Sequence, residues 1–128
     1  MGARTQVLVK QGKEQVYLYS HWGSGSILKT VKTALSKRWR WNDMEYLARI
    51  IFCEMVKDDI NGEVGYGIGA SQHGDLDNLV TVDVSKQTVS FQDMFSGSVF
   101  QGMSFEGFCG TNEDDIEKVE LKNEDTNA

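Results

Sequence analysis

Cysteines are few in this sequence, and long apolar runs are missing. Cys53 and Cys109 lie in apolar surroundings without a CxxC or Cys/His spacing, so neither a zinc site nor a disulfide framework is indicated and we expect a reducing compartment. The longest apolar run is the four residues 50–53, whereas a membrane-spanning helix needs roughly 20. No basic start followed by an apolar stretch is present. We therefore expect no signal peptide, no membrane association and a cytoplasmic protein.

Motifs with an assigned chemistry are missing too. The phosphate-loop, dinucleotide-binding, nucleophile-elbow, zinc and EF-hand patterns do not occur, so we predict no metal and no cofactor. A nucleic-acid binder needs a cluster of cations to displace phosphate counterions. The sequence has no such cluster outside residues 37–41, and we do not expect nucleic acid as a partner.

The charge is unevenly distributed. Residues 112–128 carry seven acids against two lysines, which leaves twelve of the 19 acidic and eleven of the 13 basic residues in the part before them. A chain of 128 residues suits one domain. We predict one domain over residues 1–110 and an acidic, disordered tail over 111–128. The tail could be a solubilising end or a decoy for a nucleic-acid-binding surface.

The hydrophobic pattern predicts an α+β fold. Residues 5–10 and 15–22 alternate around a polar turn at 11–14, where Gly12 allows a β-hairpin. Helical spacing of apolar residues predicts one helix from serine caps at 23–26 to about 37, and another over 43–58 with a capping box of Asn42 and Glu45. Strands are predicted over 64–70, 80–84 and 88–92, and loops with one helical turn near 104–108 over 93–110. The order β-β-α-α-β-β-β favours a largely antiparallel sheet of about five strands with both helices packed on one face.

His21 is the first candidate for a functional side chain. Alternation along 15–22 places Tyr17, Tyr19 and His21 on one face of the strand, with Trp22 on the other. His21 ends the strand just before a glycine loop, where side chains often reach a pocket and backbone amides can hold an anion. The structural alternative is that His21 hydrogen-bonds within the turn while Trp22 fills the core.

Two further residues could join His21 in catalysis. Helical projection places Glu54 among Leu47, Ile50 and Ile51, and a carboxylate there must be paired or have a raised pKa. We predict that Glu54 is buried and that His21 is its partner. His73, in the polar loop 71–78, could supply an imidazole for acid/base or metal chemistry beside two aspartates, or it could be a solvated loop residue.

Aromatic residues mark the candidate binding positions. Residues 38–41 interleave Arg38 and Arg40 with Trp39 and Trp41, a composition found at sites for single-stranded nucleic acid or phosphate ligands, at protein interfaces and also in plain connections between helices. We expect this stretch to be at least partly exposed. The glycines of the predicted strand 64–70 permit close approach of another backbone or of a ligand. The remaining predicted binding residues are Tyr19, His21, Trp22 and Tyr66.

Several motifs in one order resemble a known family. They are YLYSHWG at 17–23, YLARIIF at 46–52 followed by Glu54 and KDD at 57–59, GYGI at 65–68, and VDV at 82–84 with TV at 88–89. Together they look like a family of small uncharacterised proteins of phage, prophage and some archaeal genomes. The resemblance covers roughly residues 5–92 and carries no assigned catalytic residues. It implies a small protein that binds host factors, including inhibitors of host defence.

Two functions fit these observations. The first is a non-enzymatic binding protein that occupies a host protein or sequesters a small ligand, in the host cytoplasm if the gene is phage-borne, with a homodimer left open. The second is a metal-assisted or acid/base hydrolase that uses His21, Glu54 and His73. Convergence of these three side chains on one pocket would favour the hydrolase.

Overall fold

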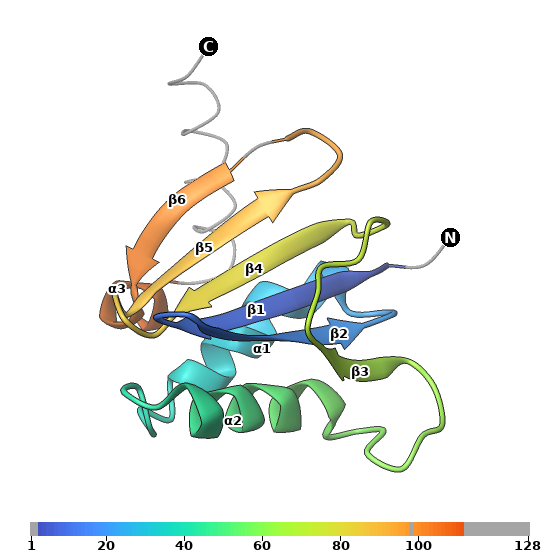
Figure 1. Ribbon diagram of the computed structural model, residues 1–128, viewed down its shortest axis with the longest axis horizontal. Helices are drawn as coiled ribbons and strands as arrows, with labels where there is room; N and C mark the ends of the chain where they lie inside the picture. The colour runs from blue at the N-terminus through green and yellow to red at the C-terminus, as the bar shows by residue number, and fades with distance from the viewer. Residues whose placement is uncertain (1–2, 98, 112–128) are drawn as a thin grey trace.

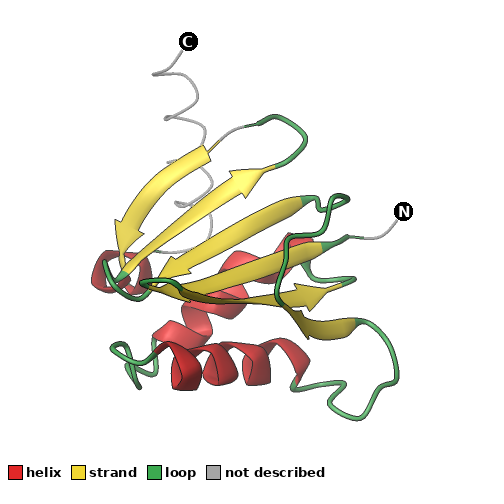
Figure 2. Cartoon of the chain, in the orientation of Figure 1, coloured by secondary structure: helices red, strands yellow, loops and turns green. Residues whose placement is uncertain are grey.

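The computed structural model describes residues 3–97 and 99–111 (Figure 1). The acidic tail predicted over 111–128 lies, apart from Thr111, outside the described residues and stays a prediction. The fold is α+β, as the hydrophobic pattern predicts: one mostly antiparallel sheet with helices layered against it (Figure 2). None of the helices in the described ranges is long and apolar enough to cross a membrane.

Within the described residues, six strands form the sheet, in the spatial order β3-β2-β1-β4-β5-β6. Their bounds are β1 (Thr5–Gln11), β2 (Glu14–Ser20), β3 (Tyr66–Gly69), β4 (Asn78–Asp83), β5 (Thr88–Asp93) and β6 (Val99–Ser104). Every neighbouring pair is antiparallel except β1 and β4. That one parallel pair brings the starts of β1 and β4 to the same end of the sheet as the ends of β2 and β5, and the candidate site lies at this end.

The predicted hairpin is confirmed, and its register separates two faces. Gly12, with φ of 61°, makes the turn between β1 and β2. Val7 pairs with Leu18 on the face that carries the main core, while Leu8 pairs with Tyr17 on the other face. The alternation predicted for Tyr17 and Tyr19 is therefore what the structure has.

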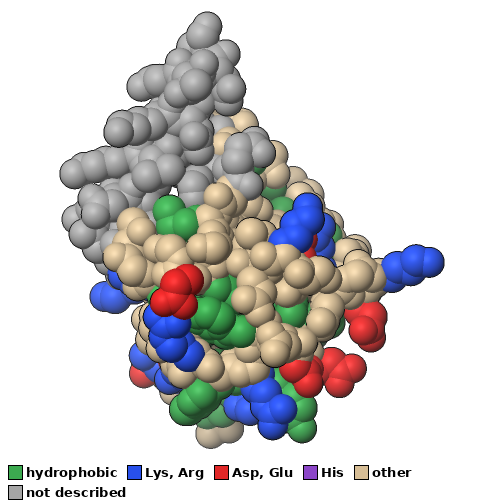
Figure 3. All heavy atoms as spheres, turned by 90° about the vertical axis from the view of Figure 1, so that its left-hand side faces the viewer, with side chains coloured by type: hydrophobic (Ala, Val, Ile, Leu, Met, Phe, Trp, Pro, Cys, Tyr) green, Lys and Arg blue, Asp and Glu red, His purple; other side chains and the backbone are tan. Residues whose placement is uncertain are grey.

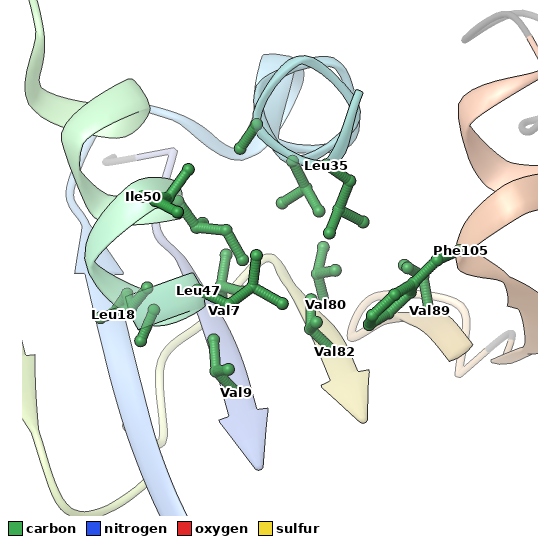
Figure 4. Packing of buried hydrophobic residues seen from close by; sticks show 14 of the residues in the cluster. Val7, Val9, Leu18, Leu35, Leu47, Ile50, Val80, Val82, Val89 and Phe105 are labelled. Atoms are coloured by element: carbon green, nitrogen blue, oxygen red, sulfur yellow. The ribbon is translucent and has the colours of Figure 1, made fainter. Parts of the chain in front are cut away.

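Both predicted helices pack on one face of the sheet. They are α1 (Ile27–Leu35), which follows the short 3-10 helix η1 (Ser24–Ser26), and α2 (Met44–Val56). Figure 4 shows Leu35 of α1 and Leu47 of α2 pointing toward Val80 of β4. These three side chains are fully buried, and each contributes about 1.5 to 3 kcal/mol through burial.

The helix starts differ from the predicted caps. The side chain of Asp43, one residue after the expected Asn42, accepts from the backbone amides of Glu45 and Tyr46 and caps α2. Ser26 precedes α1 without a side-chain cap bond. Aspartate and asparagine are equally good caps, so the backbone conformation decides which residue caps the helix. Asp43 has the extended backbone of an N-cap residue.

The segment predicted as loops contains the sixth strand. Residues 99–104 form β6, and the predicted helical turn is present as α3 (Phe105–Cys109). Phe105 and Phe108 are both buried in the main core. The pairing of β6 with β5 shifts register between Val89 and Phe91, and this irregularity removes the regular alternation by which a strand is recognised in sequence.

The loop from β3 to β4 crosses the sheet face that lies away from the helices (Figure 1). β3 is an edge strand beyond β2, whereas β4 lies beside β1, so the chain must pass over β2 and β1 to reach its place. The side chain of Gln6 in β1 holds this loop: its amide nitrogen donates to the carbonyl of Ser71 and its oxygen accepts from the amide of His73. The crossing carries His73 over Tyr19 of β2 and brings two aspartates beside Arg4, just before β1.

Candidate functional site

The backbone of His21 is fixed from both sides, just after β2 ends. Its amide donates to the carbonyl of Gly65 at 2.8 Å, and its carbonyl accepts from the amide of Ala3 at 3.1 Å. In the side chain, Nδ1 accepts from Nε of Arg4 at 3.3 Å and lies 3.2 Å from the hydroxyl of Tyr19. A guanidinium can only donate, so Nδ1 must carry a lone pair and the ring proton sits on Nε2. Nε2 has no acceptor among the described residues and is a free donor.

A row of ring contacts runs through His21. His73 stacks on Tyr19 with 4.5 Å between ring centroids, and Tyr19 lies 6.5 Å from His21. His21 meets the edge of Trp22 at 5.6 Å, and Trp22 meets Tyr66 at 5.9 Å. Offset and edge-on geometries of this kind are the favourable ones for aromatic pairs. The structure thus brings together Tyr19, His21, Trp22 and Tyr66, all predicted binding residues, with His73.

Trp22 does not fill the core, so that alternative prediction is wrong. Its side chain is 51% exposed, and Ser20 is the last buried residue of β2. The indole lies against the backbone of Gly65, where an added Cβ would fall 2.0 Å from Cζ3 of the ring. Gly65 has φ of +105°, a conformation that only glycine adopts readily. A glycine at this position lets the indole cover the chain instead of entering the core.

Trp22 forms one wall of a cleft of about 710 Å³ at this end of the sheet. Four segments meet there: the start of β1, the end of β2, the approach to β4 and the loop after β5. The cleft is lined by Ala3, Arg4, His21, Trp22, Asp75, Leu76, Asp77 and Phe95. Phe95 is 80% exposed, so two large aromatic surfaces face solvent around one concavity. Exposed aromatic rings beside a few fixed polar groups are typical of ligand sites.

The polar groups of the cleft hold one another in place. Arg4 forms an ion pair with Asp75 at 2.5 Å. Asp77 accepts from the hydroxyl of Ser24 at 3.2 Å, and its backbone amide donates to the carbonyl of Arg4. Next in the chain, Oδ1 of Asn78 is buried without a hydrogen-bond partner among the described residues. Such an acceptor costs about 1 to 3 kcal/mol, so the start of β4 carries polar groups beyond those the fold satisfies.

Glu54 lies in the helical layer and not at this cleft. Its side chain is 11% exposed, so Glu54 is partly buried and not fully buried as predicted, and it pairs with Nζ of Lys57 at 2.6 Å. The predicted partnership with His21 is wrong, because the carboxylate is paired with Lys57, which directly follows α2 and lies one helical turn after Glu54. The hydrogen bond and charge of Glu54 raise the pKa of Lys57. His21 and His73 flank Tyr19 on one face of the sheet while Glu54 lies on the other, so the three candidate catalytic residues do not converge.

Residues 37–41 lie at the opposite end of the sheet. Gln11, at the end of β1, bonds to the backbone of Asn42 and Met44, and β1 separates this end from the cleft by about 20 Å. Arg38, Trp39 and Arg40 are exposed, as predicted. Figure 3 views this end and shows basic, acidic and hydrophobic side chains intermixed, without one dominant sign of charge.

Part of this stretch is structural. Arg38 donates two hydrogen bonds, at 2.5 and 2.8 Å, to the carboxylate of Glu106 in α3 and lies over the ring of Trp41. These hydrogen bonds, and then the charge of Arg38, lower the pKa of Glu106. Trp41 donates to the carbonyl of Leu35 and meets Phe105 edge-on. Arg38 and Trp41 therefore tie the helix connection to the core, whereas Trp39 remains 58% exposed.

Sequence reasoning missed Arg4 and Phe95, and it considered Asp75 and Asp77 only as partners of His73 in metal or acid/base chemistry or as solvated loop residues. Nothing local distinguishes Arg4, because its role depends on the parallel pairing of β1 with β4. No group of His, Cys, Asp and Glu within residues 3–97 and 99–111 could hold a metal ion, so the loop aspartates and His73 do not form the metal site considered for them.

No protein-family model matches the chain, and neither the curated proteins nor the solved structures contain a match to it.

Proposed function

We propose that this protein is a non-enzymatic binding protein that retains a small ligand in the cleft beside His21. The observation that carries the proposal is the cleft itself: about 710 Å³, bounded by two exposed aromatic side chains, with its ion pair and hydrogen bonds already formed. Pre-organised polar groups reduce the cost of binding because they need not be ordered by the ligand.

Binding is favoured over catalysis by the way the titratable groups are arranged. The imidazole Nδ1 of His21 is engaged by Arg4, and among the described residues no serine, cysteine or threonine lines the cleft as a nucleophile for His21 to activate. Catalytic sites instead place a nucleophile within hydrogen-bond reach of a base. The separation of Glu54 from both histidines removes the acid/base constellation on which the hydrolase alternative depends.

In its wider role, the protein would act in the cytoplasm of a host cell as a small phage or prophage binder. A protein of this kind that retains a small ligand stoichiometrically could inhibit a host defence that depends on that ligand. This role rests on the sequence resemblance, and the cleft supplies a place where the ligand could be held.

A second candidate function is occupation of a host protein through residues 37–41. Trp39 is 58% exposed, and Lys37 lies over its ring at 5.4 Å. Trp and Arg are the residues that most often dominate protein interfaces. Trp39→Ala should abolish such an interaction and leave ligand retention by the cleft unchanged.

The test is to load the purified protein with the small-molecule fraction of a cell extract, wash it, denature it and identify the released compounds by mass spectrometry. We expect one compound in stoichiometric amount from the parent and from Trp39→Ala, and none from Trp22→Ala. The proposal is wrong if the parent releases nothing, if Trp22→Ala releases the same compound, or if the compound is converted to a product during incubation.

A further inference from the structure

We infer that the cleft takes a ligand with a positive charge, an ammonium or guanidinium group carried on an apolar stem. This inference rests on the proposed function, since it names the chemical class of the ligand held at the same site.

The charges around the cleft leave one carboxylate without a cation. Arg4 and Asp75 neutralise each other at 2.5 Å. Asp77 lines the same cleft. Within the described part of the chain, its carboxylate accepts a hydrogen bond from the neutral hydroxyl of Ser24 and forms no ion pair. The lining therefore carries a net charge of about −1 and attracts a cation.

The two aromatic walls favour the same ligand. A cation over the face of an aromatic ring is stabilised by about 0.5 to 2 kcal/mol, and most strongly over Trp. Three rings at the far end of the sheet already have cations of this chain over them: Trp39, Trp41 and Tyr46. Among the described residues, neither Trp22 nor Phe95 has one. These two rings and Asp77 together leave room for a cation that the protein does not itself supply.

Two free donors specify the rest of the ligand. Nε2 of His21 and the indole nitrogen of Trp22 have no acceptor among the described residues. A ligand that combines a cation for Asp77 with a carbonyl for one of these donors would use both kinds of group. An arginine or lysine unit has this combination, whether it is free or part of a peptide.

The experiment compares Nα-acetyl-arginine amide with Nα-acetyl-citrulline amide, which has nearly the same shape but no charge. Binding is followed by the shift of the Trp22 indole resonance in NMR spectra of the full chain. We expect the arginine probe to bind at least about tenfold more tightly than the citrulline probe. Asp77→Asn should remove that preference, while Asp58→Asn, an equal change of net charge in an exposed loop away from the cleft, should keep it.

Three outcomes overturn the inference: equal binding of the two probes, an unchanged preference in Asp77→Asn with a native spectrum, or tighter binding of inorganic phosphate than of the arginine probe. A comparison of free arginine with the peptide Gly-Arg-Gly distinguishes a free ligand from a basic residue of a partner. If the extract experiment yields a neutral or anionic compound that depends on Trp22, the proposed function stands and the positive charge is refuted. If the extract experiment yields nothing, the proposed function fails, whatever the probes show.

Discussion

Gly65→Ala should destabilise the protein and disturb the wall of the cleft at the same time. The new Cβ would lie 2.0 Å from Cζ3 and 2.4 Å from Cη2 of Trp22, well inside van der Waals contact. Trp22 is half exposed, so its ring can swing into solvent, but it then leaves its edge contacts with His21 and Tyr66. The backbone remains at φ of +105°, where a side chain is strained.

The two effects give the expected magnitude. Strain of this kind costs about 1 to 3 kcal/mol, and each lost aromatic contact about 0.5 to 1.5 kcal/mol, less at an exposed site. We expect the free energy of unfolding, measured by urea denaturation, to fall by about 2 to 4 kcal/mol, with a change in the Trp22 indole resonance.

The matched control is Gly67→Ala, two residues further along the chain and inside β3. An added Cβ there has nothing within 4 Å, and we expect a change of less than about 1 kcal/mol. If Gly65→Ala is as stable as the parent and leaves the Trp22 resonance in place, the contact between Trp22 and Gly65 does not hold the cleft wall.

Three further predictions concern the rest of the molecule. The pKa of Glu106 is lowered in the folded state from its ordinary value of 4.5, so its pairing with Arg38 stabilises the protein fully above that pH and stabilises it less as the pH falls through the folded pKa. Glu106→Gln should therefore weaken the dependence of the urea midpoint on pH in the acidic range. An unchanged pH dependence would show that the pair contributes nothing to stability. Glu54→Ala should change the free energy of unfolding by less than about 1 kcal/mol, since its partner Lys57 is 60% exposed and can be solvated by water; a loss of 3 kcal/mol by urea denaturation would reveal a buried donor that depends on Glu54. Trp39→Ala should leave the thermal midpoint nearly unchanged, within about 0.5 kcal/mol of unfolding free energy, and a large drop would mean that Trp39 packs against the core.

The sequence predicts those parts of the fold that repeat at a fixed period. Alternation along β2 separates Leu18 from Tyr17, and helical spacing in α2 places Leu47 in the core; both are observed. β6 escaped prediction because Gly102, at φ of +129°, and the register shift opposite it interrupt the alternation. The alternation of apolar and polar residues cannot reveal a strand whose pairing with its neighbour is irregular.

The candidate site was predictable only in part, for a related reason. Tyr19, His21 and Trp22 adjoin one another in sequence, so their common location follows from the strand. Arg4 and Phe95 join them through the pairing of β1 with β4 and of β4 with β5, contacts between residues far apart in the chain. The low exposure of the Glu54 side chain followed from helical projection, but its partner did not, because a flexible lysine one turn away can satisfy a carboxylate as well as a distant imidazole.

The most direct test of the cleft uses the three tryptophans as separate reporters. Each indole N–H gives its own NMR resonance, and Trp22 lies at the cleft while Trp39 and Trp41 lie about 20 Å away at the other end of the sheet. Titration with the small-molecule fraction of a cell extract should shift the Trp22 resonance and leave the other two in place. A shift of Trp39 with Trp22 unchanged, or no shift at all, would contradict the assignment of this cleft as the ligand site.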